Sequence, residues 1–266
     1  MFNTDYINYS DYVDGDAFES LGVSGAVYLK TDHVKQALEK PFAGSVLITH
    51  NSDINLTDEL VKDVWSRHPH LKAWFGQNVR ARHPKLCPIP LGLERARWFP
   101  EIGKKEQLNN LARAPRPAPS SLCLANFSLS TNRAVRSACA RVARAELGPY
   151  ATSQVCETLP PCTFVSYRSF LQEILRHKFV LCPEGNGLDT HRQCETLYLG
   201  RIPVVTRSAA IEAFASLPMV ILESWSELSC EVLENYEQRF RQGKIAYDLE
   251  KLCMSYWKKR ISRAAT

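Results

Sequence analysis

Short apolar runs alternate with helical patterns in the first part of the chain. Each run is rich in β-branched or other apolar residues and is bounded by turn residues, which is typical of a buried strand. Asp32 is placed to cap a helix that continues through Glu39, and Thr57 is placed to begin a second helix. The expected strands are residues 25–29, 45–49, 71–75 and 86–92. Strands that alternate with helices in this way predict a parallel sheet with covering helices.

A proline-rich stretch, residues 112–121, contains three prolines and shows no periodicity, so we interpret it as a linker. The alternation resumes beyond it, and a helical tail over 225–261 is expected to break at Gly243. The expected elements are strands 122–126, 178–182, 202–206 and 219–222 and helices 131–147, 167–176 and 189–199. The chain therefore predicts an α/β fold of two Rossmann-like domains, residues 1–114 and 115–266, whose parallel sheets face each other across a cleft. Such sheets bind ligands beyond the carboxyl ends of their strands.

The composition is that of a globular protein. Of the 266 residues, 45% are hydrophobic and 23% are charged, which argues against a disordered chain or a coiled coil. The net charge of +5 suits an anionic ligand such as a nucleotide diphosphate. It is too small for the basic stripe of a dedicated nucleic-acid binder, so we expect no nucleic-acid partner.

The cysteines and the N-terminal segment indicate the compartment. Nine cysteines at scattered positions form no C-x-x-C pair, so the thiols are interpreted as mostly buried and reduced rather than as a disulfide framework or a zinc site. The first residues are acidic and polar, unlike a signal peptide or an anchor, and no apolar run approaches the roughly 20 residues that span a bilayer. We therefore expect a soluble, cytoplasmic protein without a membrane span.

The loop after the expected strand 178–182 has the most informative chemistry. It contains Gly185, Asn186 and Gly187, and a helix opens near Asp189. Glycines let a backbone approach a ligand closely, and the free N–H groups at a helix start favour an anion. Glycine loops between a strand and a helix are also common without any ligand, so the chemistry of the following helix matters.

Three polar residues share one face at the start of this helix. Arg192 offers a fork of donors to phosphate oxygens, His191 precedes it, and Glu195 lies one turn further on, where it would accept hydrogen bonds from ribose hydroxyls. The alternative is a surface ion pair between Arg192 and Glu195, worth a few tenths of a kcal/mol. The residues alone favour an anion or nucleotide site.

The same segment resembles the nucleotide-sugar half of exostosin-like glycosyltransferases. An aromatic-led helix, YRSFLQEILRHKFVL, is followed by P-x-G-N-G-x-D-x-H-R, a glutamate and L-x-L-G-x-I-P-V-V. The pattern is filled here by Pro183, Gly185, Asn186, Gly187, Asp189, His191, Arg192, Glu195, Gly200 and Pro203. LCLANFSLSTNRAVR resembles the start of the same half, where Arg136 matches a basic residue of the family. LITHNSD and WFGQNVRARHPKLCPIPLGLERARW resemble first-half segments of the shorter exostosin-like proteins.

This resemblance implies a GT-B fold, an inverting mechanism and no requirement for a divalent metal or other cofactor. The donor, a UDP-sugar, would lie in the second half against Arg136 and the residues of the loop and helix. The first half would supply the general base and the site for a glycan acceptor. UDP-xylose is the favoured donor, because short exostosin-like proteins include xylosyltransferases.

An inverting transfer needs a base that takes a proton from the acceptor hydroxyl. Asp53 follows the expected strand 45–49 and would face the cleft if the carboxyl end of that strand does. A turn or capping aspartate is an equally good interpretation of its N-S-D context. His50 is the second candidate for the base, and a structural histidine is the alternative for it. Arg136 is interpreted either as a diphosphate ligand or as a solvated helix arginine.

For several other residues we favour a structural or solvent-exposed role over a functional one. Glu94, Arg95 and Arg97 follow the expected strand 86–92 and are expected to be solvated, although they could line the cleft. Asp14 and Asp16 match the metal-binding D-x-D motif of another glycosyltransferase fold. They precede any clear strand, so we do not interpret them as a metal site. Core or interface positions are expected for Trp65, Trp74 and Trp98.

Two other functions remain open from the sequence. An NADP-dependent oxidoreductase would use Gly185 and Gly187 as a dinucleotide fingerprint and Arg207 for the 2′-phosphate, but Thr190 occupies the third glycine position. A non-catalytic module of the same fold, which binds a sugar or nucleotide, would differ only in lacking a competent base.

Overall fold

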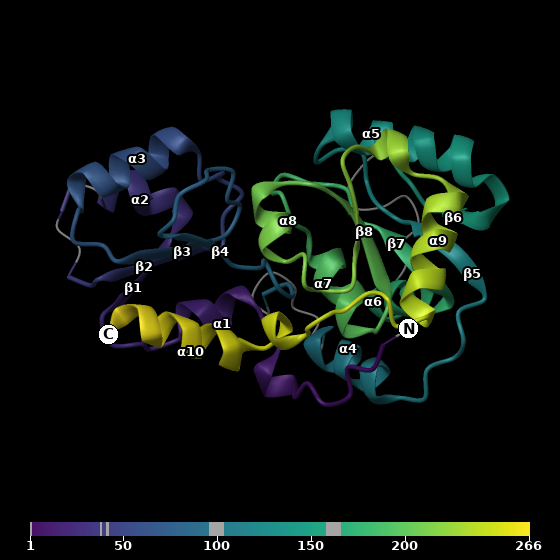
Figure 1. Cartoon of the computed structure of the whole chain (residues 1–266), viewed down its shortest axis with the longest axis horizontal. Coiled ribbons are helices and arrows are strands. Elements are labelled where there is room, and N and C mark those ends of the chain that lie inside the picture. The colour runs from purple at the N-terminus through teal and green to yellow at the C-terminus, as the bar shows by residue number, and fades with distance from the viewer. Residues whose placement is uncertain (1, 38, 41–42, 96–103, 158–165) are drawn as a thin grey trace.

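The structure is a computed structural model that describes residues 2–37, 39–40, 43–95, 104–157 and 166–266. It consists of two parallel sheets, each with its own helices, placed side by side (Figure 1). The first sheet has the order β1-β2-β3-β4, with strands Ala26–Lys30, Val46–His50, Ala73–Gly76 and Leu86–Pro88. The second has the order β6-β5-β7-β8-β9, with strands Ala151–Ser153, Ser121–Ala125, His177–Leu181, Ile202–Thr206 and Val220–Leu222. The expected α/β class with two Rossmann-like parallel sheets is confirmed.

One face of the first sheet packs against α2 (Val34–Ala37) and α3 (Asp58–Arg67). The hydroxyl of Thr57 accepts a hydrogen bond from the Leu60 amide at 3.4 Å, which confirms the expected start of α3. Leu60 and Val64 on this helix pack with Trp74 of β3 in a separate small core. Alternate residues of the strands thus point to the α3 side, as the period of a strand requires.

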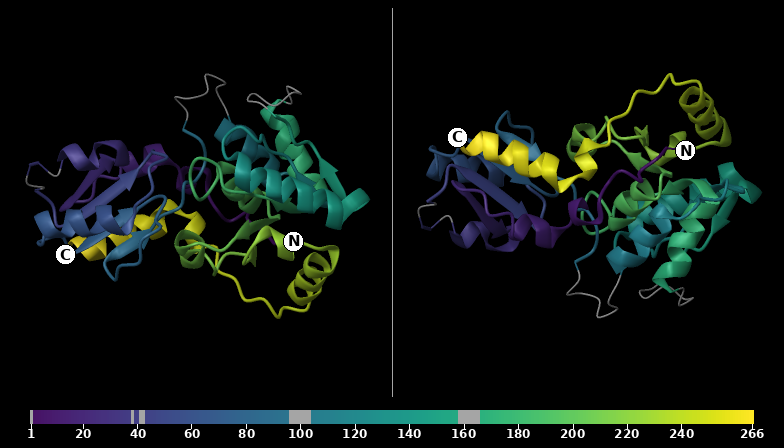
Figure 2. Two further views of the ribbon diagram at one scale, coloured as in Figure 1. Left: turned by 90° about the horizontal axis from the view of Figure 1, so that it is seen from above. Right: turned by 90° about the horizontal axis from the view of Figure 1, so that it is seen from below.

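The other face of the first sheet is covered by α1 (Gly15–Glu19) and by α10 (Met254–Ala265) (Figures 1 and 2). Trp257 and Ile261 of α10 are fully buried in the same core cluster as Ile48 and Phe75 of the strands. Crossovers between parallel strands in one sequential order place their helices on one face, so the second face is covered by more distant parts of the chain. The chain therefore returns to the first sheet after it has completed the second.

In the second sheet the order in which successive strands are added reverses after β6. Strand β6 pairs with one edge of β5, whereas β7, β8 and β9 follow on the other edge. The helices around this sheet are α5 (Arg133–Val142), α6 (Tyr167–Arg176), α7 (His191–Tyr198), α8 (Ala209–Ala213) and α9 (Cys230–Arg241). A doubly wound sheet with this order has its ligand crevice where the strand order reverses, at the carboxyl ends of β5 and β7.

The helical tail is in two pieces, as the glycine predicts. Helix α9 ends at Arg241 and is followed by Gly243 at φ +67°, a conformation that favours glycine. Most of the stretch 242–253 is not helical, so α10 is a separate helix. The expected linker is shorter than proposed, because α4 (Lys104–Arg113) runs into it and only residues 114–120 lack regular structure.

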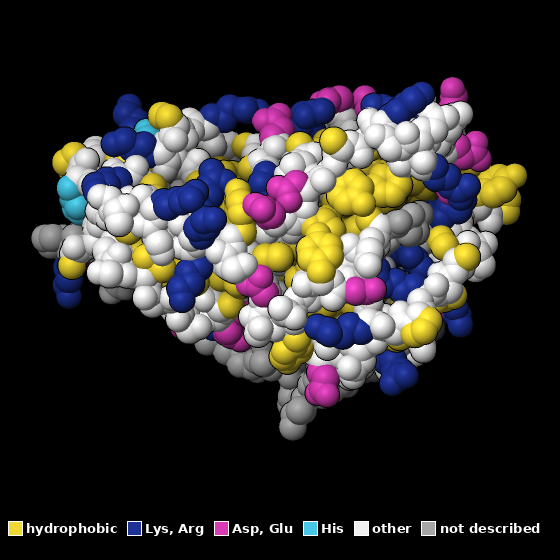
Figure 3. All heavy atoms as spheres, turned by 60° about the horizontal axis from the view of Figure 1, so that its bottom comes forward, with side chains coloured by type: hydrophobic (Ala, Val, Ile, Leu, Met, Phe, Trp, Pro, Cys, Tyr) yellow, Lys and Arg dark blue, Asp and Glu magenta, His cyan; other side chains and the backbone are white. Residues whose placement is uncertain are grey.

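Three bulk expectations can be compared with the described residues. Of the eight cysteines there, five are buried, in line with the expectation of mostly buried cysteines. On the face shown in Figure 3, Lys and Arg side chains are interspersed with Asp, Glu and hydrophobic side chains. Within the described part of the chain, no helix has the length and apolar character needed to cross a bilayer.

Candidate functional site

A cavity of about 670 Å³ lies between the two halves at the carboxyl ends of their strands. Its first wall is formed by residues 51–54 after β2 and residues 93–95 after β4. Its second wall is formed by residues 185–187 and 189–191 after β7, together with Thr131 and Arg136 from the region that follows β5. A volume of about 300–1,000 Å³ is usual for a pocket that encloses a small organic ligand. Because its second wall comes from the regions that follow β5 and β7, the cavity lies at the crevice that the strand order of the second sheet predicts.

Arg136 extends from α5 into this cavity. Its Nη1 donates to the Ser128 carbonyl at 2.7 Å and its Nε donates to the Glu184 carbonyl at 3.0 Å, which fixes the guanidinium group. The residue is only 7% exposed, and no carboxylate of the described residues forms an ion pair with it. Burial and the nearby charge of Arg192 lower the pKa of Arg136 to about 10. A buried cation of this kind is stabilised by an anionic partner.

Gly185 is required by the position of this arginine. A Cβ atom added at Gly185 would lie 2.9 Å from Nη2 of Arg136, closer than real Cβ contacts. The side chain of Asn132 donates to the Gly185 carbonyl at 3.1 Å and holds the loop in this place. The glycine thus allows the loop after β7 to pass directly beside a fixed guanidinium group.

Further polar atoms at this wall lack partners among the described residues. The hydroxyl oxygens of Thr131 and Thr190 are buried without a hydrogen bond, and so is Nε of Arg192. Arg192 stands behind the cavity lining with its guanidinium carbon 5.7 Å from the centre of the Phe170 ring. Thr190 is the N-cap of α7, its side chain makes no capping bond, and it lines the cavity with His191, so the start of this helix faces the cavity. The chemistry of the wall fits an anion with several oxygen acceptors.

Glu195 is buried behind Arg192 and does not line the cavity. Its Oε1 accepts a hydrogen bond from the hydroxyl of Tyr167 at 3.0 Å. Burial raises the pKa of Glu195, while the charges of His191 and Arg192 act in the opposite direction. Because Glu195 does not line the cavity, its expected hydrogen bond with a ribose stays a prediction, and it requires the ribose to reach behind the lining.

Two residues of the second half make hydrogen bonds across the cavity to the first half. Nδ1 of His191 lies 2.9 Å from the Gly92 carbonyl and its Nε2 lies 3.1 Å from Glu94. Burial lowers the pKa of His191, but the hydrogen bond and charge of Glu94 outweigh it, so that the pKa is raised overall. Oδ2 of Asp189 accepts the Leu91 amide at 2.6 Å, while Oδ1 is buried without a partner. Burial raises the pKa of Asp189 to about 6.

The two base candidates of the first half have different surroundings. Asp53 is exposed, lines the cavity and accepts a hydrogen bond from Nδ2 of Asn186 at 3.2 Å. His50 is fully buried, and its two ring nitrogens lie 3.0 Å from the side chain of Asn51 and 3.0 Å from the Pro90 carbonyl. Burial lowers the pKa of His50, which does not line the cavity. Only Asp53 of this pair is in reach of a molecule in the cavity.

Asn51 turns the chain at the end of β2 and was not singled out from the sequence. It has φ +61°, which asparagine tolerates better than most residues. Its Nδ2 donates to the Tyr28 hydroxyl at 2.5 Å and to the Gly15 carbonyl at 3.1 Å. Because its backbone amide also donates to Oε1 of Gln77 at 3.0 Å, the turn is held on three sides and presents Asp53 to the cavity.

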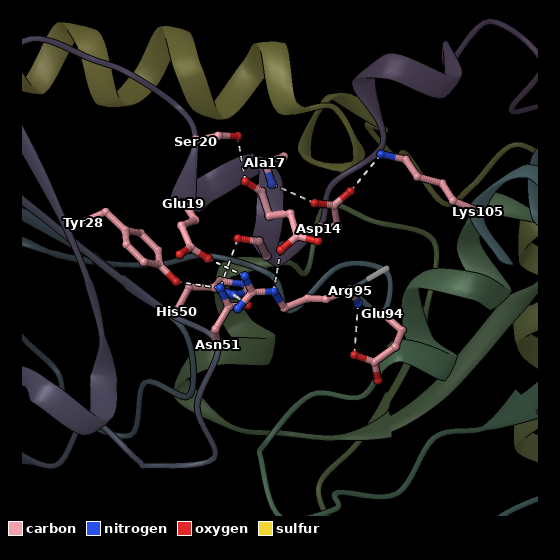
Figure 4. A network of polar contacts seen from close by, with 12 residues as sticks. Asp14, Ala17, Glu19, Ser20, Tyr28, His50, Asn51, Glu94, Arg95 and Lys105 are labelled. Atoms are coloured by element: carbon pink, nitrogen blue, oxygen red, sulfur yellow. Dashed lines mark hydrogen bonds and ion pairs between the residues drawn. The ribbon is translucent and has the colours of Figure 1, made fainter. Parts of the chain in front are cut away.

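The acidic residues of the D-x-D segment have structural partners, and those of Asp14 are shown in Figure 4. Asp14 caps α1 by accepting the Ala17 amide at 2.7 Å, and its other oxygen lies 2.8 Å from Lys105. Asp16 lies 2.6 Å from Nε of Arg95, which also pairs with Glu19. Among the residues that the structure describes, no group of three or more His, Cys, Asp or Glu side chains is arranged to hold a metal ion.

The expectation of a solvated Arg95 is wrong, because this side chain is 7% exposed and neutralised by two carboxylates. Glu94 is partly buried against His191, and both it and Arg95 line the cavity. Trp74 is fully buried, and the centre of its ring lies 5.8 Å from the centre of the Trp65 ring, as expected for a core pair. Arg97 and Trp98 lie outside the described residues.

Comparison with known proteins adds no assignment to this geometry. No protein-family model matches the chain, and a search of curated proteins finds no match. A functional conclusion must therefore come from the residues around the cavity.

Proposed function

We propose that the chain is an inverting, metal-independent glycosyltransferase of the GT-B type, which transfers a sugar from a UDP-sugar to a hydroxyl of a glycan. The main support is Arg136, a buried cation without a carboxylate partner among the described residues, held at the switch point of the second sheet. A ligand with a negatively charged diphosphate compensates this charge and the unpartnered donors beside it.

The donor is assigned to the second wall. Its diphosphate lies against Arg136, the glycine loop and the open start of α7, where backbone N–H groups and the helix dipole favour an anion. Arg192 adds positive charge from behind, and the proposal requires the ribose to reach behind the cavity lining, where Glu195 accepts a hydrogen bond from it. UDP-xylose remains the favoured donor.

The acceptor is assigned to the first wall, where Asp53 takes the proton from its hydroxyl group. The acceptor oxygen then forms a bond to the anomeric carbon as the bond from that carbon to the diphosphate oxygen breaks. Attack from the side opposite to the leaving group inverts the anomeric configuration. UDP leaves with the negative charge that Arg136 and the helix start stabilise.

The oxidoreductase alternative receives less support from the described residues. Arg207, its candidate ligand for a 2′-phosphate, lies 2.6 Å from Glu223 and 3.8 Å from Glu212. A cation between two carboxylates is poorly suited to attract a further phosphate. The binding-only alternative uses the same donor contacts, so turnover separates it from a transferase.

Calorimetry with UDP and two arginine variants tests the proposal. Arg136→Met removes charge-assisted hydrogen bonds to the diphosphate and should weaken UDP binding by about 2–3 kcal/mol, on the order of 30- to 150-fold. Arg133→Gln is the matched control, because Arg133 lies one turn earlier on α5, is 66% exposed and pairs with Glu157. It should leave UDP affinity unchanged.

A donor panel then separates a transferase from a binding module. The wild-type protein should hydrolyse at least one UDP-sugar slowly without an acceptor, with UDP-xylose tested first. Absence of UDP binding to the folded wild-type protein would reject the proposal. UDP binding without hydrolysis or transfer of any donor would favour the binding module.

A further inference from the structure

Asn78 connects the two halves through its side chain. It lies between β3 and β4, is 2% exposed and has φ +55°. Its Nδ2 donates to the Ser52 carbonyl of the first half at 2.8 Å. Its Oδ1 accepts the Leu188 amide of the second half at 2.9 Å. A single buried amide group therefore joins the loops that form the two walls of the cavity.

The second half contacts this amide closely because Gly187 has no side chain. A Cβ atom added at Gly187 would lie 2.7 Å from Oδ1 and 3.0 Å from Nδ2 of Asn78. The first half is anchored to the same residue a second time, since the Leu56 amide donates to the Asn78 carbonyl at 2.9 Å. The glycine that the sequence suggests for phosphate binding thus leaves room for this contact between the halves.

The connection is adjacent to the groups proposed to react. Ser52 precedes Asp53, and Leu188 lies two residues after Asn186, whose side chain contacts Asp53. The two hydrogen bonds of the Asn78 side chain, to Ser52 and to Leu188, therefore fix the separation of Asp53 from the loop assigned to the donor. An amide is suited to this place, because one end must donate to a carbonyl and the other must accept from an amide.

We propose that Asn78 is a positioning residue that holds the cleft in its closed geometry and so places Asp53 against the donor loop. The catalytic consequence rests on the proposed function, whereas the closure of the cleft does not. Two experiments on the whole chain of 266 residues separate these parts.

Hydrogen–deuterium exchange tests the closure. The Leu91 amide crosses the cavity to Asp189 and forms no bond with Asn78, so it reports on the cleft as a whole. In Asn78→Ala, exchange at both Leu188 and Leu91 should accelerate by about tenfold or more, because local opening exposes both amides. Faster exchange at Leu188 alone would show that Asn78 protects only the amide that it binds, and would overturn the proposal.

Matched variants guard this result against general unfolding. Asn109→Ala on α4 removes an amide outside the cavity lining and should leave exchange at Leu91 unchanged. The buried Val180 amide of β7 should stay protected in every variant. If Asn78→Ala does not fold, Asn78→Asp retains the shape but faces the Ser52 carbonyl with a carboxylate, and should accelerate Leu91 exchange in the same way.

Kinetics tests the catalytic consequence. For a UDP-sugar that the wild-type protein turns over, Asn78→Ala should lower kcat by about 10- to 100-fold, since a displaced base loses its reactive geometry. The Kd for UDP should stay within about twofold, because the assigned diphosphate contacts belong to the second half. An equal loss in UDP affinity, or unchanged kcat, would contradict the positioning role. A wild-type protein without turnover would reject the proposed function, and the exchange result would still decide the closure.

Discussion

The side-chain nitrogen of Asn186 lies 3.2 Å from a carboxylate oxygen of Asp53, so the loop after β7 touches the loop after β2 across the cavity. The two residues come from opposite sheets, and each follows the carboxyl end of a strand. Ligands of parallel α/β sheets bind at such ends. This contact places the base proposed for the reaction next to the loop proposed to bind the donor.

Asp53→Asn should lower kcat by roughly 10²- to 10⁴-fold, because an amide does not take the proton from the acceptor hydroxyl. UDP affinity and the melting temperature should hardly change, since the side chain is exposed and belongs to the first half. Steady-state kinetics measures kcat, and calorimetry on the same preparation measures UDP affinity and the melting temperature. Near-normal turnover in this variant would place the base elsewhere.

Glu195→Ala should weaken UDP binding by about 1–3 kcal/mol, because a ribose hydroxyl and the Tyr167 hydroxyl both lose their acceptor. Tyr167→Phe is the companion variant, since it removes the second hydroxyl and leaves the carboxylate. It should keep most of the affinity. The prediction fails if folded Glu195→Ala binds UDP as tightly as the wild-type protein.

Turnover should survive EDTA. In the proposed mechanism Arg136 and the start of α7 stabilise the leaving diphosphate, and the acidic pair Asp14 and Asp16 is occupied by a helix cap and ion pairs. The measurement is donor turnover before and after removal of divalent ions. Loss of activity that manganese or magnesium restores would reverse this assignment.

Asp189 should make folding stability fall as the pH rises from about 4 to about 6. Burial raises its pKa to about 6 from the ordinary value of 3.8, so in this interval the folded protein keeps a proton that the unfolded chain has released. Fewer protons in the unfolded state mean a free energy of unfolding that decreases with pH, here by about 2–3 kcal/mol. Asp189→Asn should lack this decrease, as denaturant unfolding at several pH values would measure. Parallel pH curves for the two proteins would contradict the assignment.

The elements that the sequence predicts well are those with local causes. The apolar run of β8, the capping hydroxyl of Thr57 and the stripe of α3 each depend on residues within a few positions of one another. Gly185 after β7 and Arg136 on the helix after β5 are each visible along the chain, whereas their contact with each other joins two distant segments. Burial of Arg136 without a carboxylate partner among the described residues is visible only in the structure.

The features that the sequence does not reveal depend on distant partners. Asn78 lies in an irregular loop, and its partner Leu188 is 110 residues away. Arg95 follows an apolar run, as many solvated arginines do, but its carboxylate partners are 79 and 76 residues earlier. Such pairings arise from tertiary contacts that local propensity does not determine.

The return of α10 to the first sheet makes the order of synthesis important. The four strands of that sheet leave the ribosome long before Trp257 and Ile261 are made, so the face with Ile48 and Phe75 stays without its cover until α10 emerges. Exposed apolar surface of this kind promotes association during folding. We expect residues 1–114 expressed alone to aggregate, and co-expression of the segment that contains α10 to improve their solubility. Although the sheets are separate in space, the first reaches its native state only after the second has been synthesised.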